Sequence, residues 1–217
     1  MQVLNELKDR GLLAAIAIGR GVTVAPSSGK LQSALEQLVA ERANEDFPSQ
    51  PEKEAVRNLL KTRAFKPTGR NKPASEYLAQ AAREGRFPFI NNLVDINNYV
   101  SLRSGLPISL LDADVVGDAL ILRHGCDGER YVFNTAGQEI DLHGLICACS
   151  GETNAPLGNP VKDSVAGKIK DGTSNVIGLI YSPDTGELAE LARKHVEVFA
   201  ELLKSEGQAR EIWVILA

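Results

Sequence analysis

The sequence has few of the residues on which small secreted, metal-binding or membrane proteins depend. Its 217 residues include three cysteines, three histidines and one methionine, and aromatic residues make up only 5%. A small, odd number of cysteines argues against a disulfide framework and indicates a reducing compartment. No apolar run approaches the length of a membrane span, and residues 1–21 lack the pattern of a signal peptide. We therefore expect a cytoplasmic protein without a membrane partner.

Positive charge is also scarce over the chain as a whole. The formal net charge is −4, from 24 basic and 28 acidic residues, which disfavours a general attraction to polyanions. The exception is the stretch 61–72, which contains no acidic residue and reads as a loop. Such a loop is predicted to contact nucleic-acid phosphates. The alternative is a solvated connector, because basic side chains are mostly exposed in any case. The basic residues are Lys61, Arg63, Lys66, Arg70 and Lys72.

The overall composition, with 43% apolar and 24% charged residues, is ordinary for a globular protein. The length suits one domain, or a domain with an extension. We expect an α+β fold with a mixed β-sheet and helices packed on it. Residues 1–62 are predicted to form a strand and helices integrated with the core of a main domain, 63–217. Periodicity and turn signals predict helices at 28–42, 51–61, 74–84, 91–103 and 185–204, and strands at 12–18, 118–123, 129–134, 145–149, 175–181 and 211–216.

The least generic segment is 87–114, where asparagines and an aspartate crowd an apolar stretch predicted to be a helix. These residues are mediocre helix formers that compete for backbone hydrogen bonds. Asn91, Asp95 and Asn98 share one helical face, and the apolar positions share another. We therefore expect one side of the helix to pack in the core and the polar stripe to face something else. The alternative is structural: Asn91 or Asn92 caps the helix, and Asp95 stabilises its first turns.

The same segment carries a motif with fixed spacings, and it resembles the B3/B4 domain of the phenylalanyl-tRNA synthetase beta subunit. The motif residues are Val94-Asp95-Ile96-Asn97-Asn98-Tyr99-Val100, followed by Leu102, Gly105, Pro107 and Asp112. A looser resemblance extends over residues 63–183 and includes Gly151-Glu152 and the run 171–176. Ser109 stands where the family often has a histidine, so the role of that histidine does not carry over to this chain.

In that synthetase the domain is an editing module that hydrolyses wrongly attached amino acids from tRNA. The resemblance therefore implies a free-standing, trans-acting deacylase that removes a mischarged or non-protein amino acid from tRNA, without a cofactor. The implied partner is the aminoacylated 3′ end of tRNA, contacted by the basic loop, and no DNA partner is expected. The alternative is a non-catalytic tRNA- or amino-acid-binding module of the same fold, which the serine at position 109 keeps open.

Hydrolysis of an activated ester needs a donor for the developing oxyanion, an acceptor that orients water, and a carboxylate for the substrate ammonium. The Asn-rich helix offers these groups, with Glu152 and Thr173 arriving from elsewhere in the chain. The predicted catalytic residues are Asn92, Asp95, Asn98 and Glu152. The predicted substrate-binding residues are Asn91, Ser101, Ser109, Asp112 and Thr173.

A third possibility is a metal-dependent hydrolase that uses cysteine and histidine. Cys147 and Cys149 alternate on one predicted strand, so their sulfurs face the same side, and His143, His124 and Cys126 are further candidate ligands. Their spacing matches no familiar zinc pattern, and buried structural cysteines are the simpler interpretation. We therefore predict no metal site and leave the roles of the three cysteines open.

Overall fold

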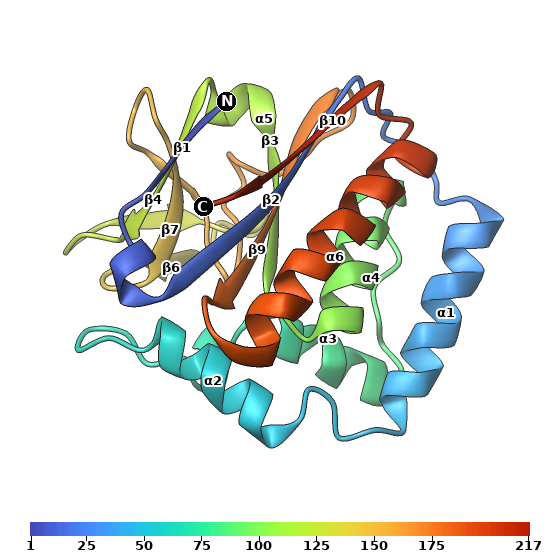
Figure 1. Cartoon of the computed structure of the whole chain (residues 1–217), viewed down its shortest axis with the longest axis horizontal. Helices are drawn as coiled ribbons and strands as arrows, with labels where there is room; N and C mark the ends of the chain where they lie inside the picture. Colours follow the sequence, from blue (N-terminus) through green and yellow to red (C-terminus); the bar gives the residue numbers. More distant parts are fainter.

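The first sheet is built around the two longest apolar strands of the chain. The computed structural model describes residues 1–217, and its first sheet has the antiparallel order β10-β2-β9-β3 (Figure 1). The runs that predict strands at 12–18 and 175–181 form its two central strands. Both are buried almost throughout, so neither needs polar residues at alternate positions. The strands are β2 (Leu12–Arg20), β3 (Ile108–Asp112), β9 (Asn175–Pro183) and β10 (Glu211–Leu216).

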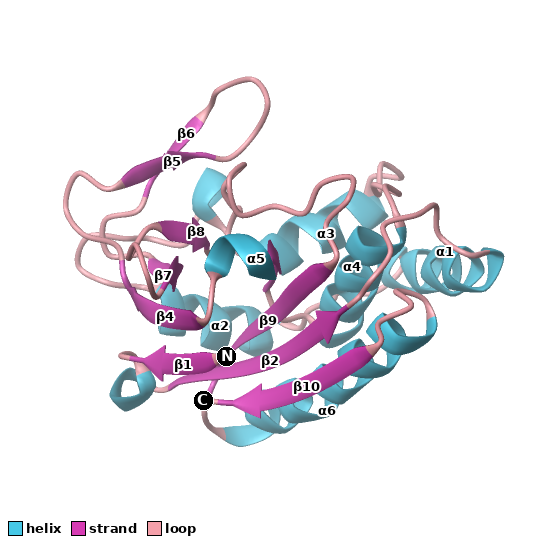
Figure 2. Cartoon of the chain, turned by 90° about the horizontal axis from the view of Figure 1, so that it is seen from above, coloured by secondary structure: helices cyan, strands magenta, loops and turns pink.

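The second sheet is mixed, with the order β1-β4-β7-β8, in which β1 pairs with β4 in parallel and the other pairs are antiparallel. A separate two-stranded ribbon, β5 with β6, projects from this side of the molecule (Figure 2). The mixed sheet, with helices on the other side of the fold, confirms the predicted α+β class. The strands are β1 (Gln2–Asn5), β4 (Ala119–His124), β5 (Arg130–Val132), β6 (Glu139–Asp141), β7 (Ile146–Ser150) and β8 (Pro156–Gly158).

The five predicted helices are all present, each within about one residue of its predicted bounds. Local chemistry explains their ends: Ser28 Oγ accepts from Leu31 N at 3.1 Å at the start of the first helix, and Gly105 has a left-handed backbone (φ 74°) after the fourth. A single turn, α5 (Ala113–Val116), is additional. The five are α1 (Gly29–Ala43), α2 (Gln50–Leu60), α3 (Ala74–Arg83), α4 (Asn92–Ser104) and α6 (Gly186–Ser205).

Two glycines show which layer covers which face of the first sheet. A Cβ added at Gly178 of β9 would lie 2.6 Å from the ring of Phe199, so α6 packs on that face. A Cβ at Gly158 of β8 would lie 3.1 Å from Ser109 Oγ. Ser109 points to the opposite face, because it is next to Leu110, which pairs with Gly178. The second sheet therefore covers the face opposite α6, while α4 packs with α6 (Figure 1).

The N-terminal and C-terminal segments share one sheet, because β2 lies between β9 and β10. Their apolar side chains also belong to one buried core. The predicted division of the chain at residue 62 stays a prediction. None of the helices combines the length and the hydropathy that crossing a membrane requires.

Candidate functional site

The polar stripe of α4 is buried inside the protein, so the expectation that it faces something other than the core of this chain is wrong. Asp95 is only 3% exposed and Asn98 only 7%. The reason is that α4 is surrounded by α1, α3, α6 and β3. The stripe therefore meets neighbouring segments of the same chain, and its individual contacts show what each side chain does.

Asn92 and Asp95 tie the beginning of α4 to the rest of the chain. Asn92 accepts one backbone N–H at 3.0 Å from the segment before α1 and donates to two backbone carbonyls, at 2.8 and 3.0 Å. Asp95 accepts from Ser27 Oγ at 2.6 Å and from Ile90 N at 2.9 Å. These bonds account for the positions of both side chains. A catalytic role for either residue stays a prediction.

The predicted substrate-binding residues are divided between two places. Asn91 caps α4 by accepting from the backbone N–H three residues later at 3.0 Å, and Ser101 Oγ donates to a backbone carbonyl beyond the helix end at 2.7 Å. Asp112 and Thr173 are brought together elsewhere, where Thr173 Oγ1 donates to Asp112 Oδ2 at 2.6 Å at the end of β3. These four side chains serve helix ends and a loop, and they do not line one cavity.

Asn98 and Glu152 are the two predicted catalytic residues with spare polar atoms, and the fold separates them. The Asn98 side chain has one hydrogen bond, from Asn97 Nδ2 at 3.4 Å, and Asn97 Oδ1 is buried without a partner. Glu152 follows β7 in the second sheet, with its carboxylate against Gly117. Because α4 packs on the opposite face of the first sheet, Glu152 does not join Asn98 in one site.

Ser109, the remaining predicted residue, belongs to a polar cluster between the two sheets. Its Oγ lies 2.6 Å from Asp163 Oδ1 and 2.9 Å from Tyr181 Oη. The Asp163 carboxylate also accepts from the backbone N–H groups of Leu110 at 3.3 Å and Asn159 at 3.2 Å. Ser109 and Tyr181 are fully buried, whereas Asp163 is half-buried. Strands β3 and β9 and the loop after β8 therefore converge on one carboxylate.

The electrostatic setting of Asp163 suits proton transfer. Its hydrogen-bond donors are all neutral groups. Burial raises the pKa of Asp163 to about 6, although these hydrogen bonds and the charge of Lys168 favour the carboxylate. Burial also raises the pKa of Tyr181 well above its ordinary value, so its hydroxyl keeps its proton. A carboxylate with a pKa near neutrality can act as a general base toward water.

Sequence reasoning missed Asp163 and Tyr181 because neither lies in a recognisable motif. Asp163 sits in an irregular loop, and a tyrosine in a strand is common. The one available signal was the position of Tyr181 at the end of an aliphatic run, since a buried tyrosine hydroxyl needs a hydrogen-bond partner. That signal does not name the partner.

The basic loop lies on the surface, and none of its five cations forms an ion pair. Lys72 is half-buried: it donates to Gln80, and its Nζ lies 4.4 Å from the centroid of the Tyr77 ring. Because no carboxylate neutralises these charges, they remain available to an anionic partner. The predicted RNA contact stays a prediction. The exposed members are Lys61, Arg63, Lys66 and Arg70.

A groove of about 700 Å³ lies next to this loop. Its lining includes Arg70 of the basic loop, Phe133 and Asp141 from the ends of the β5–β6 ribbon, and Lys162. Lys162 directly precedes Asp163 in the chain, which connects the lining of the groove to the loop that carries the carboxylate. The groove and the cluster together form the candidate functional site.

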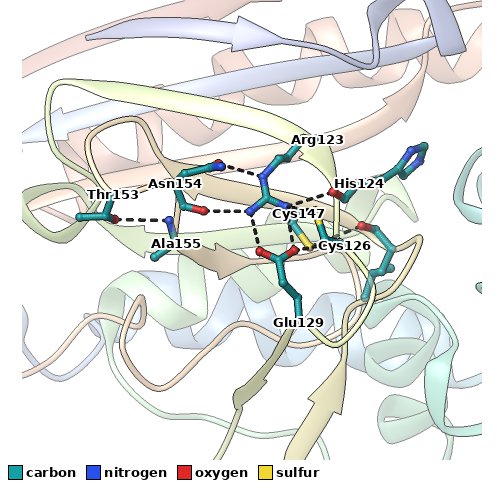
Figure 3. Close-up of polar contacts among 9 residues, drawn as sticks. Arg123, His124, Cys126, Glu129, Cys147, Thr153, Asn154 and Ala155 are labelled. Atoms are coloured by element: carbon teal, nitrogen blue, oxygen red, sulfur yellow. Dashed lines mark hydrogen bonds and ion pairs between the residues drawn. The ribbon is translucent and has the colours of Figure 1, made fainter.

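A second half-buried carboxylate, Glu129, belongs to a cluster around Arg123 of β4 (Figure 3). The Arg123 guanidinium donates to both Glu129 oxygens at 2.8 and 2.7 Å, and to the side chain and backbone oxygens of Asn154, each at 2.8 Å. Glu129 also accepts from Cys126 N at 2.6 Å. The hydrogen bonds from Arg123 lower the pKa of Glu129. This cluster joins two loops to the second sheet.

Cys147 and Cys149 are fully buried in β7. Burial raises the pKa of the Cys149 thiol to about 12 and that of Cys147 further above its usual range. A thiol that stays protonated at neutral pH is a poor nucleophile. No group of three or more histidine, cysteine, aspartate or glutamate side chains is arranged to hold a metal ion.

Comparison with known proteins decides the family. Residues 60–196, more than half of the chain, match the family model described as the B3/4 domain. The chain belongs to the B3/4 domain family. This finding confirms the resemblance carried by the motif in α4. The matched region of this B3/4 domain contains α4 and also Ser109, Asp163 and Tyr181 of the carboxylate cluster.

The relatives of this B3/4 domain include the phenylalanine–tRNA ligase beta subunits of Staphylococcus aureus, among them that of strain COL, which are 32% identical over 97 residues. That alignment covers 43% of this chain and 12% of the relative, so the chain spans a small part of their length. A solved N-terminal fragment of the phenylalanyl-tRNA synthetase beta-subunit from Pyrococcus horikoshii aligns with a TM-score of 0.46 and 14% identity, covering 100% of this chain and 54% of that one.

Proposed function

We propose that this B3/4 domain hydrolyses the ester bond of aminoacyl-tRNA and removes a mischarged or non-protein amino acid in trans. The family and its relatives, which are named as phenylalanine–tRNA ligase subunits, supply the substrate class. The observation that carries the reaction is the Asp163 carboxylate, which accepts a hydrogen bond from Ser109 Oγ and has a pKa of about 6. The predicted cytoplasmic location and the lack of a cofactor belong to the same proposal.

In this reaction Asp163 takes a proton from water while the water oxygen attacks the carbonyl carbon of the ester. The bond from that carbon to the terminal ribose oxygen then breaks. The ribose oxygen takes the proton back from Asp163, and free amino acid and tRNA are released. Ser109 and Tyr181 are positioning residues, because both are fully buried: Ser109 Oγ donates to the carboxylate, and Tyr181 Oη is hydrogen-bonded to Ser109 Oγ. An activated ester does not need a covalent nucleophile, and general base catalysis contributes roughly 10²–10⁴-fold.

A second candidate function is a non-catalytic module that binds tRNA or an amino acid. A specific observation favours it: Asn92 and Asp95, two of the four residues predicted to be catalytic, direct their hydrogen bonds inside the fold. Ser109 stands where the family often has a histidine, and this difference also favours the non-catalytic module.

A deacylation screen separates the two functions. The protein is incubated with tRNAs charged with near-cognate and non-protein amino acids, and ester loss is measured against buffer, alongside tRNA affinity. The hydrolase predicts ester loss for at least one charged tRNA, at a rate that a strong chelator leaves unchanged. Tight tRNA binding without ester loss assigns the binding module. A rate that collapses with the chelator and returns with zinc contradicts the proposed mechanism.

A further inference from the structure

The groove next to the basic loop draws its lining from three separate segments of the chain. Its volume of about 700 Å³ lies within the range of ligand-binding pockets. Its walls come from the basic loop, from the segment before Asp163 and from the β5–β6 ribbon, which projects from the second sheet (Figure 2). Only Phe133 and Ile140 in its lining are apolar. Such a polar lining favours a charged or strongly hydrogen-bonding ligand.

Two cations from separate segments, Arg70 and Lys162, face this groove. Neither forms an ion pair within the chain. Burial and, after it, the positive charge of Arg70 lower the pKa of Lys162, so the two groups are close enough to repel each other. An anion bound between them relieves this repulsion. Phosphate is well suited, because a guanidinium and an ammonium both bind its oxygens through charge-assisted hydrogen bonds.

Two carboxylates, Glu139 and Asp141, also line the groove, and each has a partner elsewhere in the chain. Glu139 Oε2 lies 3.6 Å from Arg130 Nη1, and Asp141 Oδ1 accepts from His143 N at 2.9 Å. Both keep their negative charge, but neither forms an ion pair with Arg70 or Lys162. Their remaining lone pairs can accept hydrogen bonds from the exocyclic amino group of a base, as carboxylates do from cytosine.

Phe133 adds an aromatic surface next to the cations. Its side chain is half-buried, and Lys162 Nζ lies 4.2 Å from the centroid of its ring. Its backbone is held on both sides, by Lys168 Nζ at 2.6 Å from its carbonyl oxygen and by its N–H bonded to Gln138 O at 2.9 Å. An aromatic ring beside cations is the arrangement on which unpaired bases stack while the cations contact the backbone.

We propose that this groove binds the unpaired 3′-terminal nucleotides of RNA, with a phosphate between Arg70 and Lys162 and a base against Phe133. The proposal rests on the proposed function, because a charged tRNA must place its 3′ end at the hydrolytic residue, and Lys162 of the groove is the chain neighbour of Asp163. It also extends the basic loop predicted from sequence. Of the five loop cations only Arg70 lines the groove, and the other contacts come from the ribbon and from Lys162.

The test measures binding of a short single-stranded RNA that ends in CCA and carries a 5′ fluorescein, by fluorescence anisotropy over a range of salt. Arg70→Gln with Lys162→Gln should weaken binding about tenfold or more and flatten the salt slope by about 0.7 per lost phosphate contact. Phe133→Leu should weaken binding about tenfold with an unchanged salt slope, because stacking is not ionic. Melting temperatures of all variants are measured in parallel, and affinities are compared per folded molecule.

The matched control is Lys30→Gln with Lys194→Gln, which makes the same change in net charge at two exposed lysines on α1 and α6. It should bind the RNA as the wild type does. Equal weakening by the control pair would overturn the groove as the specific subsite, as would wild-type affinity in both groove variants. Cytidine monophosphate that binds as tightly as the RNA would also overturn the proposal, in favour of a free-nucleotide pocket.

The two proposals fail separately. If the wild type hydrolyses charged tRNA but the groove variants bind RNA normally, the subsite is wrong and the hydrolase stands. If the groove variants lose RNA affinity as expected but no charged tRNA is hydrolysed, the subsite stands and the hydrolase fails.

Discussion

Glu129 and Asp163 are two partly buried carboxylates with opposite electrostatic surroundings. Glu129 accepts two hydrogen bonds from the Arg123 guanidinium, and its pKa is lowered. Asp163 accepts only from neutral donors, and burial raises its pKa to about 6. A cation therefore holds Glu129 in its ionised form, where it stabilises the loops around β4. Asp163 lacks such a partner and can exchange a proton near neutral pH. The comparison shows how charge pairing separates a carboxylate that stays ionised from one that gains and loses a proton near pH 6.

The largest expected effect is on catalysis, from Asp163→Asn. The amide keeps the size of the side chain but cannot act as a base, so single-turnover deacylation should fall about 100-fold or more. Asp171→Asn, a matched change at an exposed loop aspartate, should leave the rate unchanged. A rate that survives Asp163→Asn in folded protein would place the base elsewhere.

Glu129→Gln should reverse this pattern and act on stability. It leaves the Arg123 guanidinium, only 10% exposed, without its charged partner, at an expected cost of about 2 kcal/mol in the free energy of unfolding. Deacylation per folded molecule should not change. Glu139→Gln is the control, because the ion pair that it removes, with Arg130, is largely exposed. Urea denaturation of this variant should show a loss of less than about 1 kcal/mol in the free energy of unfolding. A slower rate at normal stability in Glu129→Gln would move the active site to the Arg123 cluster.

On α4 a smaller effect is expected, and here the sequence and the structure make different predictions. Asp95→Asn weakens one of the bonds from Ser27 Oγ and Ile90 N, so it should cost about 1 kcal/mol of stability and leave the rate intact. Asn98→Ala removes only a long contact with Asn97 and should leave stability unchanged or slightly higher. Melting temperature and single-turnover rate are measured on both. A tenfold slower rate with normal stability would support the catalytic role predicted from sequence.

A further expected effect is on the pH dependence of stability, where the two carboxylates have opposite signs. Asp163 has a pKa of about 6 in the folded state, against an ordinary 3.8. Between these values the folded protein binds more protons than the unfolded chain, so this group lowers stability as pH rises from about 4 to about 6. Glu129, whose pKa is lowered from 4.5, adds stability that is lost as pH falls below that value.

Urea denaturation at several pH values between about 3 and 7 tests these signs. Asp163→Asn should remove the decline between about pH 4 and 6, and Glu129→Gln should remove the loss at the acid end. Deacylation by the wild type should rise with pH, reach half of its maximum near pH 6 and level off about one unit higher, as the Asp163 carboxylate forms. A rate that is constant across this window would exclude Asp163 as the base.

The sequence identified the helices, the central strands and the edge strand β10, but not the edge strands β1, β3 and β8. The start of α4 at Asn91 and its end at Gly105 follow from capping chemistry within a few residues. By contrast, β1 and β3 have only four and five residues. Such short segments become strands because remote partners, β4 and β9, pair with them, and no local pattern records that pairing.

By itself, the sequence determined five helices, the long buried strands and the motif that relates this chain to the B3/4 domains. These features depend on residues close together in the chain, through periodicity, capping and spacing. Only the tertiary structure decided which polar side chains are free to act. It buried the stripe of α4 and brought Ser109 to Asp163 and Tyr181 from 54 and 72 residues away. The pKa of a carboxylate depends on its desolvation and on its hydrogen-bond donors, and here distant segments supply both.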